Sequence, residues 1–226
     1  MSGRITIGVF IPCGAQLLDV AAVDVLGVMS KEYFATASDI VPPPIFAAAP
    51  EVIVYYISTP SLGGEIPLTS GAILKPTHTY KDDAVAPGKL DIVLVPGPDP
   101  ACEPDEGGLE WLRRQNATKG VDILSVCTGL YICGAAGIAD GKLASGPRGV
   151  QDDLRKKFPK VKLVGANQRW VQDGNFWSSG GITNGNDLVA AYARLSGRWD
   201  QSVVQMGLAF TEVDDRGQFY PDAKAE

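Results

Sequence analysis

The chain has 226 residues, of which 45% are hydrophobic and 20% charged, and its formal net charge is −6 at pH 7. That composition is typical of a globular protein with a sizeable core, in one or two domains. The acidic balance argues against a nucleic-acid partner, because nucleic-acid-binding proteins gather Lys and Arg on one face. No apolar run reaches the ~18 residues that a membrane span needs, and the first residues do not have the layout of a signal peptide. We therefore expect a cytoplasmic protein with no membrane partner.

The cysteine and histidine content narrows the chemistry further. Four cysteines are too few for a disulfide scaffold in a chain of this length, and no two have C-x-x-C spacing. The single histidine, His78, leaves little for a zinc site, and the glycine pairs at 63–64 and 180–181 lack the spacing of a phosphate loop. The expectation is a protein with reduced cysteines and with neither a metal nor an organic cofactor.

Apolar runs rich in Val and Ile predict strands over residues 4–11, 51–58, 90–96 and 121–126. Their near-continuous apolarity is typical of strands that are covered on both faces, as in a parallel sheet. Apolar residues at helical spacing predict helices between and after these strands, over residues 16–30, 106–117, 128–138 and 183–196. Alternating strands and helices indicate a doubly wound α/β fold.

Other segments depart from simple alternation. Turn residues among short apolar pieces predict hairpins within residues 64–80 and 161–179. The proline-rich stretch at 37–50 is short enough to be a surface insertion, so we expect a single domain over residues 1–226. That domain has an insertion at about 31–50 and a C-terminal extension at about 197–226, whose apolar part (203–210) packs on the body or on a partner subunit.

One cysteine, Cys127, lies at a predicted strand-to-helix turn, a position that can make a thiol reactive. Cys127 comes directly after the predicted strand at 121–126 and is followed by Thr128, Gly129 and a helix rich in small residues. At such an elbow, the N–H groups of a helix N-terminus favour the thiolate and can stabilise an oxyanion. The alternative is that Cys127 is a buried small apolar side chain, as we expect of Cys133.

Three stretches together resemble the ThiJ/PfpI superfamily: residues 126–129 (VCTG), residues 94–97 (LVPG), and residues 178–185 (SSGGITNG) with Asp187. The resemblance spans roughly residues 4–196 and keeps the order of the motifs. It implies a flavodoxin-like, three-layer sandwich of the class I glutamine-amidotransferase type, with a mostly parallel central sheet and a nucleophile elbow. It also implies a homodimer.

The residues that accompany the cysteine differ among members of this superfamily. Some carry a histidine shortly after the elbow helix, but Pro147 stands at that position here. His78 lies before the strand that leads to Gly97, and we interpret it as a surface or strand residue. A protease or amidase with a Cys-His pair would therefore lack its general base.

Another branch, which resembles the isonitrile hydratases, uses an acidic residue on the first loop and helix. Residues 16–20 (QLLDV) resemble its motif, and this resemblance implies that Asp19 is the acid. Burial near the thiol of Cys127 would raise the pKa of Asp19 and make it a usable proton donor and acceptor. The alternative is an ordinary acidic residue in the first turn of a helix. Asp24 is expected to face elsewhere.

The expected reaction is hydration of a small isonitrile to an N-substituted formamide. In it, the Cys127 thiolate adds to the isonitrile carbon, and Asp19 supplies a proton and then activates water. Thr128 and a backbone N–H near Gly97 are expected to position substrate or water. Pro98 has no N–H to donate, so the oxyanion site on that side must be rebuilt from other groups.

The walls of the expected pocket are less defined. Arg148 and Trp170 are candidates, with a surface ion pair and a core position as their respective alternatives. Cys13 lies on the same loop as Asp19, and pairing with Cys127 is one open possibility.

Two further functions stay open beside the hydratase. One is glyoxalase-like or deglycase-like activity on α-oxoaldehydes. The other is a non-enzymatic redox-sensing or chaperone-like role, in which Cys127 is oxidised to a sulfinate.

Overall fold

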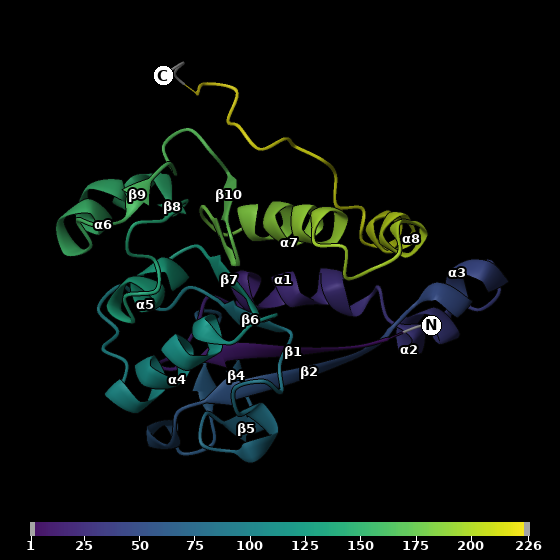
Figure 1. Cartoon of the computed structure of the whole chain (residues 1–226), viewed down its shortest axis with the longest axis horizontal. Helices are drawn as coiled ribbons and strands as arrows, with labels where there is room; N and C mark the ends of the chain where they lie inside the picture. The colour runs from purple at the N-terminus through teal and green to yellow at the C-terminus, as the bar shows by residue number, and fades with distance from the viewer. Residues whose placement is uncertain (1–2, 224–226) are drawn as a thin grey trace.

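The computed structural model describes residues 3–223, and Figure 1 shows helices on both sides of a central sheet. The sheet has seven strands in the order β10-β11-β7-β6-β1-β2-β5, and all neighbours are parallel except β10 and β11. These strands are β1 (Arg4–Ile11), β2 (Glu51–Ser58), β5 (His78–Thr79), β6 (Ile92–Val95), β7 (Asp122–Val126), β10 (Trp170–Asp173) and β11 (Phe176–Ser179). The predicted α/β class with a mostly parallel sheet is confirmed.

Alternate residues of the central strands enter two separate apolar cores. In β6, Ile92 and Leu94 belong to one core, and Val93 and Val95 belong to the other. All four side chains are fully buried, which is why this strand is apolar at every position.

The two cores are closed by different helices. The first lies under α1 (Leu17–Gly27), α7 (Asn184–Leu195) and α8 (Gln201–Thr211), and the second lies under α4 (Glu106–Ala117) and α5 (Gly129–Ala135). The short helix α6 (Gln151–Lys157) adds Leu154 to the second core. Among the described residues, no helix is both long and apolar enough to cross a membrane.

The hairpin predictions hold in part. Within residues 64–80, β3 (Ile66–Pro67) and β4 (Ile73–Leu74) pair antiparallel, while β5 joins the main sheet beside β2. Within residues 161–179, β10 and β11 form the antiparallel hairpin. The short strand β9 (Lys162–Leu163) instead pairs in parallel with β8 (Leu143–Ala144).

The segment at residues 31–50 and the C-terminal apolar stretch lie against each other. This segment contains α2 (Lys31–Thr36) and α3 (Pro43–Ala48), and α3 contacts α8. Helix α8 also contacts α1 and α7. The apolar stretch at 203–210 therefore packs on the body of the same chain, the first of the two places expected for it.

Candidate active site

The carboxyl ends of four parallel strands meet at one edge of the sheet. These strands are β11, β7, β6 and β1, which are neighbours in that order. In open α/β sheets this edge is where ligands bind. Each strand is followed by a residue of the candidate site: Ile182 after β11, Cys127 after β7, Gly97 after β6 and Asp19 after β1.

Cys127 adopts a backbone conformation that few residues other than glycine adopt. Its φ angle is +58°, and its N–H donates a hydrogen bond to the carbonyl of Ser179 at 3.2 Å. A Cβ at Gly129 would collide with the carbonyl oxygen of Val95, so a side chain there would prevent the tight turn from β7 into α5. A positive φ at the residue between a strand and the helix that follows it is typical of a nucleophile elbow.

The Asp19 carboxyl group is fully buried in the first turn of α1. Its Oδ2 accepts a hydrogen bond from the Gly97 N–H at 3.0 Å. Its Oδ1 is also buried and has no hydrogen-bond partner among the described residues. Burial raises the pKa of Asp19 to about 7, although the Gly97 N–H and the Cys127 thiol each lower it.

The thiol of Cys127 and the carboxyl group of Asp19 influence each other directly. Burial first, and then the charge of Asp19, raise the pKa of Cys127 to about 11, while the N–H groups of Ile182 and Thr128 lower it. This direction is opposite to the expected preference for the thiolate. Burial and the charge of Asp19 outweigh the two N–H groups that favour the thiolate.

Gly97 and Thr128 hold the loop after β6 against the elbow. A Cβ at Gly97 would collide with the Thr128 hydroxyl and the Asp19 carboxylate, so the close approach of these groups requires glycine. The Thr128 hydroxyl donates to the carbonyl of Pro98 at 2.7 Å. The Gly97 N–H thus points at Asp19, and Pro98 contributes its carbonyl to the loop.

The two candidate wall residues, Arg148 and Trp170, have partners in other parts of the chain. Arg148 is exposed and pairs with Asp222 at 2.8 Å, near the C-terminus. Trp170 is half-buried and stacks on Trp177 with ring centroids 6.3 Å apart. These contacts correspond to the alternatives of a surface ion pair and a core position.

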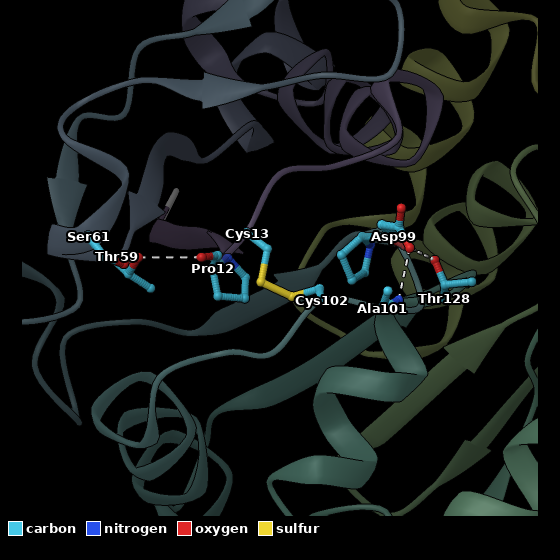
Figure 2. Close-up of a disulfide and its surroundings, with 9 residues drawn as sticks. Pro12, Cys13, Thr59, Ser61, Asp99, Ala101, Cys102 and Thr128 are labelled. Carbon is cyan, nitrogen blue, oxygen red and sulfur yellow. Dashed lines mark hydrogen bonds between the residues drawn. A yellow bond between two sulfur atoms is a disulfide. The ribbon is translucent and has the colours of Figure 1, made fainter.

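Cys13 is bonded to Cys102, not to Cys127. This disulfide joins the loop after β1 to the loop after β6, with Cα atoms 6.1 Å apart (Figure 2). The expectation of reduced cysteines is therefore wrong for this pair, which lies 89 residues apart in sequence and could not be found from spacing. Cys127 and Cys133 are free and buried.

The remaining polar candidates lie outside the site. His78 is at the sheet edge in β5, where its ring contacts Tyr55 at 4.5 Å. Asp24 is exposed. Among residues 3–223, no group of three or more His, Cys, Asp or Glu side chains is placed to hold a metal ion.

Ile182 is the part of the site that sequence reasoning missed. Its φ angle is +45°, and its N–H interacts with the Cys127 thiol. The adjacent glycine pair at 180–181 marks a turn. However, the contribution of Ile182 is a backbone group, which residue type does not reveal.

A mostly parallel α/β sandwich, with a buried cysteine at a strained elbow and a carboxyl group beside it, defines a class of elbow-cysteine proteins. A model of the DJ-1/PfpI family matches residues 27–195. The chain belongs to this family, which confirms the resemblance found in the sequence.

Individual proteins that resemble this chain agree with its assignment to the DJ-1/PfpI family. The isonitrile hydratase of Pseudomonas putida is 34% identical over 184 residues, which are 79% of this chain and 75% of the relative. A ThiJ/PfpI family protein from Pseudomonas syringae has a TM-score of 0.69 at 21% identity, covering 98% of this chain and 80% of the other. DJ-1beta of Drosophila melanogaster has a TM-score of 0.66 at 16% identity, covering 93% and 99%. The two structural likenesses establish the fold.

Proposed function

We propose that this protein is a cysteine-dependent hydratase that converts a small isonitrile to an N-substituted formamide. Cys127 is the nucleophile and Asp19 is the acid and base. The likeness to an isonitrile hydratase supports the class of reaction. The observation that carries the proposal is the buried Asp19 carboxyl group, which interacts with the thiol and has one unpartnered oxygen.

The first step needs a base for the thiol. With a pKa of about 11, Cys127 is a neutral thiol at pH 7, whereas the Asp19 carboxyl group, with a pKa of about 7, is partly ionised. The Asp19 carboxylate takes the thiol proton as the sulfur bonds to the isonitrile carbon. Asp19 then delivers this proton to the same carbon, which gives a thioimidate, R–N=CH–S–Cys127. The N–H groups of Ile182 and Thr128 stabilise the negative charge that develops on the sulfur.

The second step adds water. The Asp19 carboxylate accepts a proton from water as the hydroxyl oxygen bonds to the thioimidate carbon, and Asp19 passes this proton to the nitrogen, which gives R–NH–CH(OH)–S–Cys127. The C–S bond then breaks as the carbonyl of R–NH–CHO forms, and the hydroxyl proton passes through Asp19 to the sulfur, which restores the thiol. One water molecule is consumed in each cycle, and Asp19 ends as it began. General acid–base catalysis of this kind contributes typically ~10²–10⁴-fold to a rate.

The same features argue against a redox-sensing role. The thiolate is the form that peroxides oxidise, and burial beside a carboxylate disfavours it in Cys127. His78 at the sheet edge is no substitute for a catalytic histidine.

The test is turnover of an aryl or alkyl isonitrile, measured as formamide production. We expect Cys127→Ala to abolish turnover, and Asp19→Asn to lower kcat/KM by roughly 10²–10⁴-fold. Asp24→Asn, on the exposed side of the same helix, is the matched control and should retain wild-type turnover.

Parallel incubations with methylglyoxal and with low peroxide separate the other functions. Turnover of methylglyoxal alone would replace the hydratase with an α-oxoaldehyde enzyme. Inertness toward both substrates, with Cys127 oxidised by low peroxide, would replace it with a redox sensor.

A further inference from the structure

The residues after α8 form a strap along the body of the protein. We call residues 213–222 the C-terminal strap. It begins after Glu212, whose φ angle of +50° ends the helix, and it runs past α7 toward β10 (Figure 1, yellow). The proposed reaction gives this segment no role.

The strap is tied to the start of α7, directly after the loop that carries Ile182. The Arg216 guanidinium donates to Asp187 Oδ1 at 3.0 Å, to Asn184 Oδ1 at 3.2 Å and to Thr183 Oγ1 at 3.3 Å. Asp187 is 7% exposed, so this ion pair is largely shielded from water on the acid side. One strap side chain therefore contacts three residues that follow Ile182.

Tyr220 contacts the same loop from the other end of the strap. Its hydroxyl accepts a hydrogen bond from Asn184 Nδ2 at 2.8 Å. A Cβ at Gly180 would lie 2.8 Å from that hydroxyl, so the loop and the strap are in direct contact there. Arg148 and Arg169 lie over the Tyr220 ring at 4.5 and 4.8 Å.

Arg169 fixes the backbone of the strap. Its buried side chain donates to the carbonyls of Arg216, at 3.2 Å, and Phe219. Its backbone N–H donates to the Gln218 carbonyl at 2.7 Å, and its carbonyl accepts from the Gly180 N–H at 2.8 Å. Arg169 thus links the strap to the first residue of the loop.

The loop at residues 180–183 contributes one group to the candidate site, the backbone N–H of Ile182. Residues 180–183 connect β11 to α7, and the N–H of Ile182 reaches the Cys127 thiol from a strained, positive-φ residue. Strain of this kind costs ~1–3 kcal/mol and persists only where the surroundings hold it. The strap contacts Thr183 and Gly180 of this loop, and Arg169, which binds the strap backbone, also accepts from the Gly180 N–H.

We infer that Arg216 and Tyr220 of the C-terminal strap are positioning residues, which hold the loop 180–183 so that the Ile182 N–H donates to the Cys127 sulfur. Their hydrogen bonds go to Thr183, Asn184 and Asp187, so they act on the sulfur through the loop. The inference rests on the proposed role of Cys127 as the nucleophile. Its test does not need isonitrile turnover, so the two ideas can fail separately.

The test is the rate at which iodoacetamide alkylates Cys127 at fixed pH, followed by peptide mass spectrometry. Arg216→Ala removes the hydrogen bonds to the charged Asp187 carboxylate, so we expect a roughly tenfold slower reaction. Tyr220→Phe removes one neutral hydrogen bond, from Asn184, so we expect a few-fold slower reaction. Hydrogen–deuterium exchange of the peptide that contains residues 180–187 should be faster in both variants.

Two substitutions of the same chemistry elsewhere are the controls. Arg155→Ala breaks an exposed ion pair with Asp152, and Tyr33→Phe removes an exposed hydroxyl on α2. Both should leave alkylation and exchange unchanged. Alkylation at the wild-type rate or faster in Tyr220→Phe, with the chain folded, would overturn the inference, and so would unchanged exchange of the loop. Tyr220→Phe keeps the test decisive if Arg216→Ala does not fold.

Discussion

At the scale of single residues, the site depends on how burial acts on two neighbouring acids. Burial disfavours the charged form of both Asp19 and Cys127, and the charge of Asp19 further disfavours the Cys127 thiolate. The carboxyl group has the lower intrinsic pKa, and its pKa in the folded protein is about 7, while the thiol stays protonated at neutral pH. A single proton can therefore move between them at neutral pH, which is the condition that acid–base chemistry needs.

This arrangement has a measurable effect on stability. Between about pH 4 and pH 7, Asp19 holds its proton in the folded state and has lost it in the unfolded state, because its folded pKa is the higher one. The folded state then binds more protons, so the free energy of unfolding falls as pH rises through this window, by on the order of 4 kcal/mol. Above it, the penalty is constant.

Urea denaturation of wild type and Asp19→Asn at several pH values isolates this contribution. The stability of the variant relative to wild type should increase from pH 4 to pH 7 and then level off. Other carboxyl groups titrate equally in both proteins and cancel in the difference. A difference that stays flat across this range would show that the Asp19 carboxyl group has an ordinary pKa.

Residue type predicted the side chains of this site but not its backbone. Cys127 was found from its place after an apolar strand, and Asp19 from the resemblance of residues 16–20 to a known motif. The Ile182 N–H and the Ser179 carbonyl were not found, because any residue carries those groups. The positions of Arg148 and Trp170 depend on the strap and the hairpin, which local pattern does not fix.

At the scale of elements, the site depends on how the loops after β1 and β6 are joined. The Gln16 N–H donates to the Gly97 carbonyl at 2.8 Å, and the Gly97 N–H donates to Asp19. The Cys13–Cys102 disulfide connects the same two loops (Figure 2). The acid is thus held to the loop beside it by both hydrogen bonds and a covalent link.

The disulfide should contribute to stability because it closes a long loop in the unfolded chain. Replacing both residues, as Cys13→Ser with Cys102→Ser, should lower the free energy of unfolding by about 2–4 kcal/mol. The measurement is urea denaturation with and without dithiothreitol. Reductant should lower the wild-type midpoint to that of the double variant and leave the variant unchanged. A wild-type midpoint that does not respond to reductant would contradict this contribution.

At the scale of the whole molecule, the sheet order brings distant segments to one edge. The chain passes through β1, β6, β7 and β11 in sequence, and these four strands are neighbours in the sheet. Strand and helix positions were predictable because apolar periodicity is local. The pairing of β5 with β2, of β9 with β8, and of the strap with the loop 180–183 was not predictable, since each pairing involves at least one weakly patterned segment.

The central claim is that the sulfur of Cys127 bonds to the isonitrile carbon. Wild-type protein mixed with excess aryl isonitrile, quenched rapidly in acid and mapped by peptide mass spectrometry, tests it directly. The peptide that contains Cys127 should gain the mass of one isonitrile molecule and lose it as formamide accumulates, and Cys127→Ala should show neither change. Formamide production at the wild-type rate by Cys127→Ala, or a mass gain only on another residue, would contradict the account.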